Sequence, residues 1–310
     1  MPGSQDFAAD PRNASLKVWL SGKLVPKNEA TVSIFDAGFV LGDGVWEGLR
    51  QHKGALLFLD AHLDRLYTGA ADIALDLGLT RDEMKAALEA TLAANSMHHG
   101  AHLRLMATRG VKAAVNQDPR NALGPATIVI VAEYKEPSPD IVTRGLALAT
   151  SSIRCTPADM FDMRLNSHSR LPLIRALLDA IKAGGDEALM LDPGGFVSSC
   201  NATNFFWVKD GEVRTSTGEF CFNGVTRGAV IRLCDANAIP IRLDYFRLAD
   251  VHAADEAFVT GTFGGITPVN RVDGHMPPHG PPGPLTTRLR ALYEALKDEQ
   301  ALYAQLKSTP

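Results

Sequence analysis

The stretch Asp36–Arg50 constrains the fold of this chain more than any other. It reads DAGFVLGDGVWEGLR and ends in an arginine. Its glycines at 42 and 44 permit close backbone approach and φ angles that other residues avoid. The alternation that follows predicts a buried strand, with Leu41–Trp46 as its glycine-spaced start. Arg50 at the end of such a rigid element suits bidentate binding of a phosphate or carboxylate, although a surface ion pair is an equally simple interpretation.

Composition sets the broad class of the protein. The chain has 310 residues, of which 45% are hydrophobic and 21% charged, as in an ordinary globular protein. A net charge of −4 argues against nucleic-acid binding, and no apolar run approaches the roughly 18 residues of a membrane span. Residues 1–11 lack a signal-peptide pattern, and the four cysteines lack CxxC spacing. We therefore expect a cytoplasmic protein with reduced thiols, no metal site, and neither nucleic acid nor membrane as a partner.

The hydrophobic pattern changes period along the chain and predicts an α+β protein of two domains. Glu136–Asp140 is proline-rich and polar, and the mixed pattern restarts after it. We expect a flexible tail over 1–16, a small domain over 17–135, a linker over 136–143 and a large domain over 144–310. The expected strands are Lys17–Leu20, Lys23–Val25, Thr31–Ile34, Gly44–Gln51, Ala55–Phe58, His102–Arg109, Thr127–Ala132, Gly145–Thr150, Glu187–Leu191, Phe196–Val197, Asn204–Val208, Glu212–Thr215 and Asp255–Thr260. The expected helices have a cap at Asp60, a capping box at Thr80 and Glu83, or cover Leu171–Ala183, Thr226–Asn237 and Leu285–Ala304.

Two further segments carry the pattern of an anion site. Gly224–Arg227 is a glycine turn that leads into a predicted helix, whose N-terminal N–H groups attract anions. Val259–Val269 is a strand that runs into a loop rich in glycine and hydroxyl groups. A simple helix cap explains the first segment about as well as a ligand does.

Together with Val18–Pro26 and Glu29–Asp36, these segments and their order resemble the fold-type IV pyridoxal-phosphate enzymes. That family contains the branched-chain, D-amino-acid and (R)-amine transaminases and aminodeoxychorismate lyase. The resemblance implies the family's two-domain fold and a homodimer acting on a small amine, amino acid or keto acid. It also implies a phosphate cup formed by Arg50, Val225, Thr226, Gly261 and Thr262.

The resemblance fails where the family carries the lysine that forms a Schiff base with the cofactor. Gly184–Leu189 is similar to a family segment that fixes the register, and counting back from it places Asn166 at the lysine position. There is no lysine between Lys135 and Lys182, so no small gap restores one. In the same comparison Arg170 stands where many members have a tyrosine, and Ser199 stands where a glutamate meets the pyridine nitrogen.

These replacements predict that ordinary transamination is lost, because general acid–base catalysis alone is worth about 10²–10⁴ in rate. We expect pyridoxal or pyridoxamine phosphate to bind non-covalently, with weak or diverted amine chemistry. Two alternatives stay open: a pseudoenzyme that holds another phosphorylated molecule, or different chemistry that uses His168 or a thiol of Cys200 or Cys221.

Three more residues are site candidates with simpler explanations beside them. His168 is a substitute base, or a cap between its two serines. Arg104 binds a substrate carboxylate, or pairs with an acidic side chain. Phe39 lines a substrate pocket, or packs in the core.

Overall fold

The computed structural model describes residues 3–308, which form two compact units. The small unit comprises Ala8–Glu136, Leu165–Arg170 and the chain from Asp298 onward. The large unit comprises the chain up to Phe7, Pro137–Arg164 and Leu171–Lys297. The segment around residue 166 therefore belongs to the same unit as Arg50, although more than a hundred residues separate them in the sequence.

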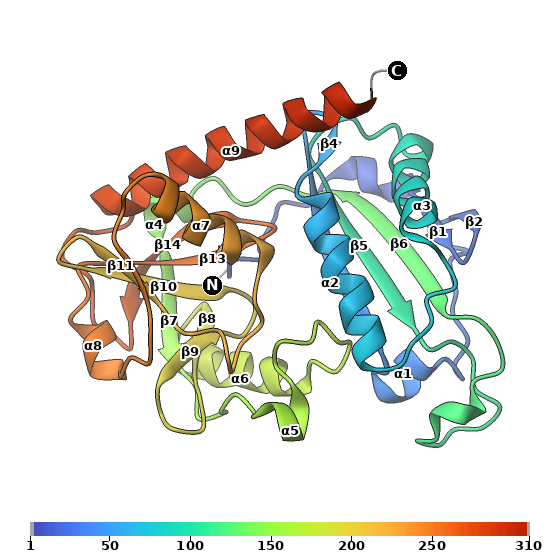
Figure 1. Cartoon of the computed structure of the whole chain (residues 1–310), viewed down its shortest axis with the longest axis horizontal. Coiled ribbons are helices and arrows are strands. Elements are labelled where there is room, and N and C mark those ends of the chain that lie inside the picture. The colour runs from blue at the N-terminus through green and yellow to red at the C-terminus, as the bar shows by residue number, and fades with distance from the viewer. Residues whose placement is uncertain (1–2, 309–310) are drawn as a thin grey trace. The chain divides into compact units, whose positions relative to one another are not determined.

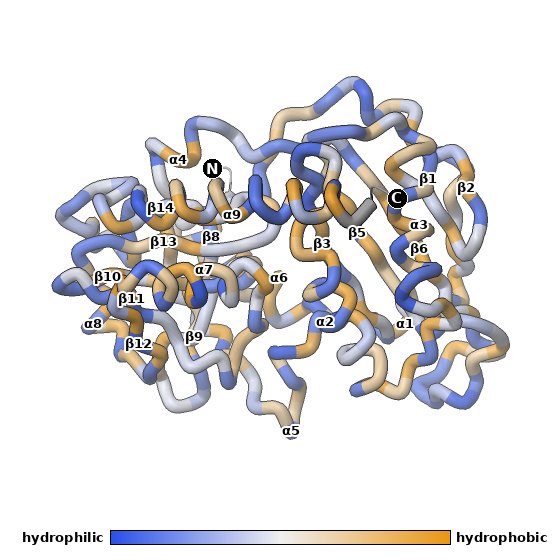
Figure 2. The backbone as a smooth tube through the Cα atoms, turned by 45° about the horizontal axis from the view of Figure 1, so that its top comes forward, coloured by the Kyte–Doolittle hydropathy of each residue, from blue (hydrophilic) through white to orange (hydrophobic). Residues whose placement is uncertain are grey.

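A six-stranded antiparallel sheet forms the centre of the small unit (Figure 1). Its strands follow the order β2 (Lys23–Pro26), β1 (Lys17–Leu20), β6 (Thr127–Tyr134), β5 (Ala101–Thr108), β3 (Gly44–His52) and β4 (Ala55–Leu56). Helices α2 (Leu59–Asp72) and α3 (Arg81–Ala94) pack against one face of the sheet. Hydrophobic and hydrophilic residues alternate along both helices (Figure 2), because only one side of each faces the core. The opposite face of the sheet carries Trp46, Arg50, His102 and Arg104.

The start of the small unit differs from the expected pattern in two places. No strand covers Thr31–Ile34; instead Asp36 caps a short helix α1 (Ala37–Leu41), accepting a hydrogen bond from the Gly38 N–H. Gly42 ends that helix with φ of 69°, so β3 begins only at Gly44. A β-rich local sequence did not form a strand here because no neighbouring strand pairs with it.

The predicted helix starts have different outcomes. The capping box of α3 is confirmed: the Glu83 N–H donates to Thr80 Oγ1, and Glu83 Oε2 accepts from the Thr80 N–H. The predicted cap at Asp60 is wrong, since α2 begins after Phe58, which has φ of 52°. Asp60 lies in the first turn, where its charge favours the helix N-terminus.

The large unit contains an eight-stranded mixed sheet, in the order β12-β11-β10-β13-β14-β7-β8-β9. Helix α6 packs on β7 and β8, and α7 packs on β12 and β13. The strands are β7 (Leu146–Thr150), β8 (Glu187–Leu191), β9 (Val197–Cys200), β10 (Asn204–Lys209), β11 (Glu212–Thr215), β12 (Ile241–Leu243), β13 (Glu256–Gly261) and β14 (Gly265–Val272). The helices are α4 (Ile141–Arg144), α5 (Ala158–Phe161), α6 (Leu171–Lys182), α7 (Val225–Ala236), α8 (Leu248–His252) and α9 (Pro284–Ser308).

The first residues of the chain make specific contacts within both units. In the large unit the Ser4 N–H donates to Glu187 Oε1 at 3.2 Å, and Ser4 is buried. In the small unit a short 3₁₀ helix covers Pro11–Ser15, and Asn13 Nδ2 donates to the Tyr134 carbonyl at 2.8 Å.

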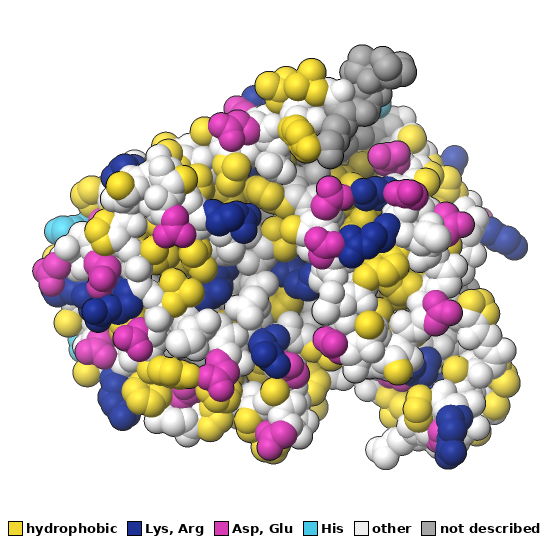
Figure 3. Space-filling view, viewed as in Figure 1, with side chains coloured by type: hydrophobic (Ala, Val, Ile, Leu, Met, Phe, Trp, Pro, Cys, Tyr) yellow, Lys and Arg dark blue, Asp and Glu magenta, His cyan; other side chains and the backbone are white. Residues whose placement is uncertain are grey.

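Charged side chains of both signs are interspersed over the face of the molecule that Figure 3 shows. Within residues 3–308, no helix is both long enough and apolar enough to cross a membrane. The same residues contain no group of three His, Cys, Asp or Glu side chains placed to hold a metal ion.

Candidate active site

The segment at the predicted lysine position lies along the free edge of β3, opposite β5. The Trp46 N–H donates to the Asn166 carbonyl at 3.0 Å, and the His168 N–H donates to the Gly44 carbonyl at 2.9 Å. Val45 and Ser167 form a β-bridge between these two bonds. Residues 166–168 therefore extend the sheet by a short edge strand, which fixes the direction of each side chain.

The Asn166 side chain is buried and hydrogen-bonded at both ends. Its Nδ2 group donates to the Trp46 carbonyl and lies 3.5 Å from Glu47 Oε1. Its Oδ1 atom accepts from Arg170 Nη2. This use of both a donor and an acceptor is specific to an amide, so Asn166 connects the segment to β3.

Glu47 is a site residue that the sequence analysis missed. It is fully buried, and Arg65 contacts both of its carboxylate oxygens at 2.7 Å. His62 Nδ1 lies 2.7 Å from Oε2. Burial alone would raise the pKa of Glu47, but the hydrogen bonds from Arg65 and His62 outweigh it and the pKa is lowered. A single acid within the apolar run Val45–Leu49 was the signal for such a buried pair.

Two arginines flank the indole ring of Trp46. Arg104 Cζ lies 3.6 Å from the centre of the ring, and Arg170 Cζ lies 5.1 Å from it. The indole N–H donates to the Ser167 carbonyl at 3.1 Å, which holds the ring in place. Burial and the nearby charge of Arg104 lower the pKa of Arg170 to about 10, so it still carries its charge at neutral pH.

His168 lies against β3 beside the same arginines. Burial lowers the pKa of His168, and the charges of Arg104 and Arg170 add to this effect, so the imidazole is neutral at pH 7. Its Nε2 atom is buried and has no hydrogen-bond partner among the described residues.

Arg50 lies where the chain leaves the small unit. Its Nη1 group donates to the Lys135 carbonyl at 2.5 Å, and its Nη2 group lies 3.9 Å from Glu136. His102 pairs with Arg50 across β3 and β5. Burial, together with the charges of Lys135 and Arg50, lowers the pKa of His102 to about 3. The imidazole of His102 is therefore neutral, and this end of the sheet is cationic.

The large unit contains the other predicted anion-binding groups. Helix α7 starts after Gly224 without a side-chain cap, and Thr226 is buried in its first turn. The Gly224 N–H donates to Asn204 Oδ1 at 3.1 Å. A Cβ at Gly224 would lie 2.4 Å from that oxygen, so only glycine fits this turn. The first N–H groups of a twelve-residue helix thus remain available to an anion.

Gly261 and Thr262 follow β13, the strand on which α7 packs. The structure thus places Val225, Thr226, Gly261 and Thr262 in one unit, on adjacent elements. Thr260, the residue before Gly261, is buried, and its Oγ1 has no hydrogen-bond partner among the described residues. Arg50 belongs to the small unit, so its joining with these groups in one phosphate cup stays a prediction.

Ser199 is buried, and its hydroxyl is used inside the large unit. It donates to the Thr203 carbonyl at 2.8 Å and accepts from Asn204 Nδ2 at 3.1 Å. Burial raises the pKa of Cys200 and Cys221, so neither thiol is a ready nucleophile. Phe39 lies on α1 with 74% of its surface exposed, and neither core packing nor a pocket is seen around it.

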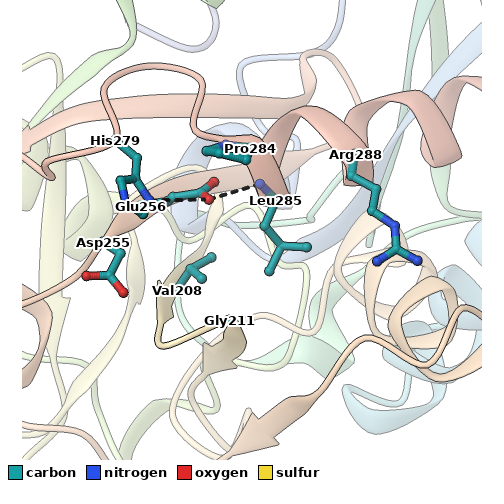
Figure 4. A pocket seen from close by; sticks show the side chains of 8 residues that line it. All are labelled: Val208, Gly211, Asp255, Glu256, His279, Pro284, Leu285 and Arg288. Atoms are coloured by element: carbon teal, nitrogen blue, oxygen red, sulfur yellow. Dashed lines mark hydrogen bonds and ion pairs between the residues drawn. The ribbon is translucent and has the colours of Figure 1, made fainter.

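A cavity of about 340 Å³ lies elsewhere in the large unit, at the N-terminus of α9 (Figure 4). Its central acid, Glu256, accepts from the N–H groups of Leu285 at 2.9 Å and Thr286 at 2.7 Å. A Cβ at Gly283 would lie 2.3 Å from the Glu256 carboxyl carbon, so the cap needs glycine. Because this carboxylate already caps the helix, and no predicted site residue lines the cavity, we assign it a structural role.

These residues fit one part of a pyridoxal-phosphate site and not another. Arg50 and the uncapped start of α7 provide cations and N–H donors suited to a phosphate group. Asn166 cannot form an imine, and its amide is already hydrogen-bonded to β3 and Arg170. The attachment point expected at residue 166 is therefore lacking.

Comparison with known proteins identifies the family. The family model described as amino-transferase class IV matches residues 44–272. The chain belongs to the class IV aminotransferase family. It is 38% identical to branched-chain-amino-acid aminotransferase-like protein 2 of Arabidopsis thaliana over 288 residues, which cover 93% of this chain and 51% of the relative. The chain thus spans about half the length of that relative.

Two further relatives match along most of their own length. A putative branched-chain-amino-acid aminotransferase of Methanocaldococcus jannaschii is 35% identical over 284 residues, 91% of this chain and 96% of the relative. A crystal structure of a bacterial-type branched-chain amino acid aminotransferase (T.th.) with pyridoxamine 5'-phosphate is 28% identical, with a TM-score of 0.86 over 92% of this chain and 95% of that one. The predicted α+β fold of the class IV aminotransferases is thereby confirmed.

Proposed function

We propose that this protein binds pyridoxal or pyridoxamine phosphate, or a similar phosphorylated ligand, through its phosphate and without a covalent bond at residue 166. The observation that carries this proposal is the contrast between the two parts of the site. Arg50 and the start of α7 keep the chemistry of phosphate binding, whereas Asn166 is part of the hydrogen bonding of the sheet edge. The T.th. relative was crystallised with pyridoxamine 5'-phosphate, which supports this class of ligand.

When bound, such a cofactor supplies an electron-accepting ring for amine and amino-acid chemistry. In this proposal Arg50 pairs with the phosphate by two charge-assisted hydrogen bonds, and the first N–H groups of α7 complete its contacts. Ser199 has no charge and hydrogen-bonds internally, so it does not hold a proton on a ring nitrogen. We infer weak or diverted activity on amines, amino acids or keto acids.

Arg104 is the group that we assign to a substrate carboxylate. Its guanidinium stacks on Trp46, which fixes its position without neutralising its charge. The T.th. relative has also been crystallised with 4-methylvaleric acid, a carboxylate.

A second candidate function is different chemistry with His168 as the base. The supporting observation is its neutral imidazole, with a buried Nε2 that accepts no hydrogen bond from the described residues. A ligand with an acidic C–H group, held by Arg104, would place a proton within reach of such a base. The third option, a non-catalytic binding protein, predicts ligand binding without turnover.

Titration calorimetry with pyridoxamine phosphate tests the proposal, because this ligand has no aldehyde and can bind only non-covalently. We expect it to bind at least tenfold more tightly than pyridoxamine, which lacks the phosphate. Equal affinities for the two, or no binding of either, would contradict the proposal.

A further inference from the structure

Lys135 lies on the same face of the small-unit sheet as the arginines of the candidate site. Its N–H donates to the Gly100 carbonyl at 3.3 Å, which continues the pairing of β5 and β6 past Tyr134. Side chains alternate along a strand, so Lys135 points to the same face as Glu133. Glu133 pairs with His102, and that face therefore also carries Arg104.

Arg50 connects Lys135 to the predicted phosphate site. It pairs with His102 across β3 and β5, and its Nη1 group donates to the Lys135 carbonyl at 2.5 Å. Burial lowers the pKa of Lys135, and the charge of Arg104 adds to this effect. A larger share of the neutral, nucleophilic amine is therefore present than for a lysine in water.

The other lysines on either side of residue 166 are placed differently. Lys182 is exposed at the end of α6 in the large unit. In the small unit, Lys112 Nζ donates to the Asp118 carbonyl, and Lys53 and Lys85 form ion pairs with Asp298 and Asp60. Lys135 is therefore the lysine that the fold brings next to Arg50.

We propose that the Lys135 amine reacts with the aldehyde of a bound pyridoxal phosphate and so replaces the lysine that residue 166 lacks. The neutral amine attacks the carbonyl carbon, a carbon–nitrogen bond forms, and the carbonyl oxygen leaves as water to give an imine. The step is reversible and involves no change of oxidation state. The proposal rests on the proposed function and extends it: pyridoxamine phosphate stays non-covalent, whereas the aldehyde form is captured.

Borohydride trapping tests this inference. The purified protein is mixed with one equivalent of pyridoxal phosphate, reduced with borohydride, digested and analysed by mass spectrometry. We expect the pyridoxyl group on the peptide that contains Lys135, at least tenfold above the peptide that contains Lys182. Lys135→Arg should remove this label while its unfolding curve stays that of the wild type, and Lys182→Gln is the matched control. Arg50→Ala should reduce the label, because the phosphate then no longer holds the aldehyde in place.

Calorimetry with pyridoxamine phosphate on the same variants separates the two proposals. If that ligand binds while Lys135 stays unlabelled, or is labelled no more than Lys182, the role of Lys135 is wrong and the proposed function stands. If it does not bind and no label appears, both fall.

Discussion

Asn166 and Trp46 bind each other through two hydrogen bonds of opposite direction. The Trp46 N–H donates to the Asn166 carbonyl at 3.0 Å, and the Asn166 side-chain amide donates to the Trp46 carbonyl. The side chain at the predicted lysine position thus extends the hydrogen bonding of the sheet edge. This residue is a structural replacement as well as a chemical one.

Asn166→Lys should weaken the protein and create a new reactive amine. A lysine has donors only, so Arg170 loses its acceptor, which costs about 1–3 kcal/mol of unfolding free energy. If residue 166 points at the aldehyde as in the family, borohydride should then place a pyridoxyl group on the new lysine. Mass spectrometry and urea unfolding measure the two effects, with Asn166→Met as the control that has no amine. An unlabelled residue 166 in protein that binds the cofactor would show that the predicted register is wrong.

Arg50→Ala should weaken the binding of pyridoxamine phosphate by roughly tenfold or more. A charge-assisted hydrogen bond to phosphate is worth about 1.5–3 kcal/mol. Calorimetry gives the affinity, and Arg175→Ala, an exposed arginine on α6, is the control. Equal affinities for wild type and Arg50→Ala would remove Arg50 from the phosphate site.

Arg65→Met should be among the most destabilising single substitutions in the small unit. It leaves the fully buried Glu47 with only His62, and breaking a buried pair costs about 3–5 kcal/mol. Arg81→Met removes an exposed pair with Asp64 and should cost less than about 1 kcal/mol. Urea unfolding of the two variants compares these values directly; similar losses would mean that Glu47 does not depend on Arg65.

Glu187 should make stability fall as the pH rises. Burial raises the pKa of this carboxyl, although hydrogen bonds from Ser4 and Thr203 oppose the shift. The stabilisation is complete below the ordinary pKa of 4.5 and is lost as the pH rises through the higher folded-state pKa. Between these values the wild type loses about 1.4 kcal/mol per pH unit, whereas Glu187→Gln does not. Urea unfolding from pH 4.5 to pH 8 tests this, with the exposed Glu89→Gln as control; parallel profiles for wild type and Glu187→Gln would contradict it.

Two copies of the chain should associate, as the family resemblance implies. Helix α6 exposes Leu171, Ile174, Leu178 and Ile181 by 51–66%, which forms an apolar stripe on one side of the helix. Light scattering should give about twice the 33.3 kDa of one chain. Leu178→Glu should shift the mass toward one chain, and Arg175→Glu on the same helix should not. A wild-type mass of one chain across the micromolar range would exclude the dimer.

The fold could be predicted from local sequence where local chemistry decides. The capping box of Thr80 and Glu83 needs only residues three apart, and it forms as expected. The Asn166 substitution is equally visible, because a missing amine needs no coordinates. Thr31–Ile34 failed for the opposite reason: a strand exists only if another strand pairs with it, and the sequence does not state its partners.

The sequence by itself determined that residue 166 has no amine and that Arg50 ends a rigid strand. Only the tertiary structure decided that Glu47 pairs with Arg65 and His62, that Asn166 bonds to Trp46, and that Lys135 lies beside Arg50. Each of these contacts depends on the register between strands, or on the packing of a helix on a sheet. Residues far apart in the chain meet only after the hydrophobic core has fixed that register.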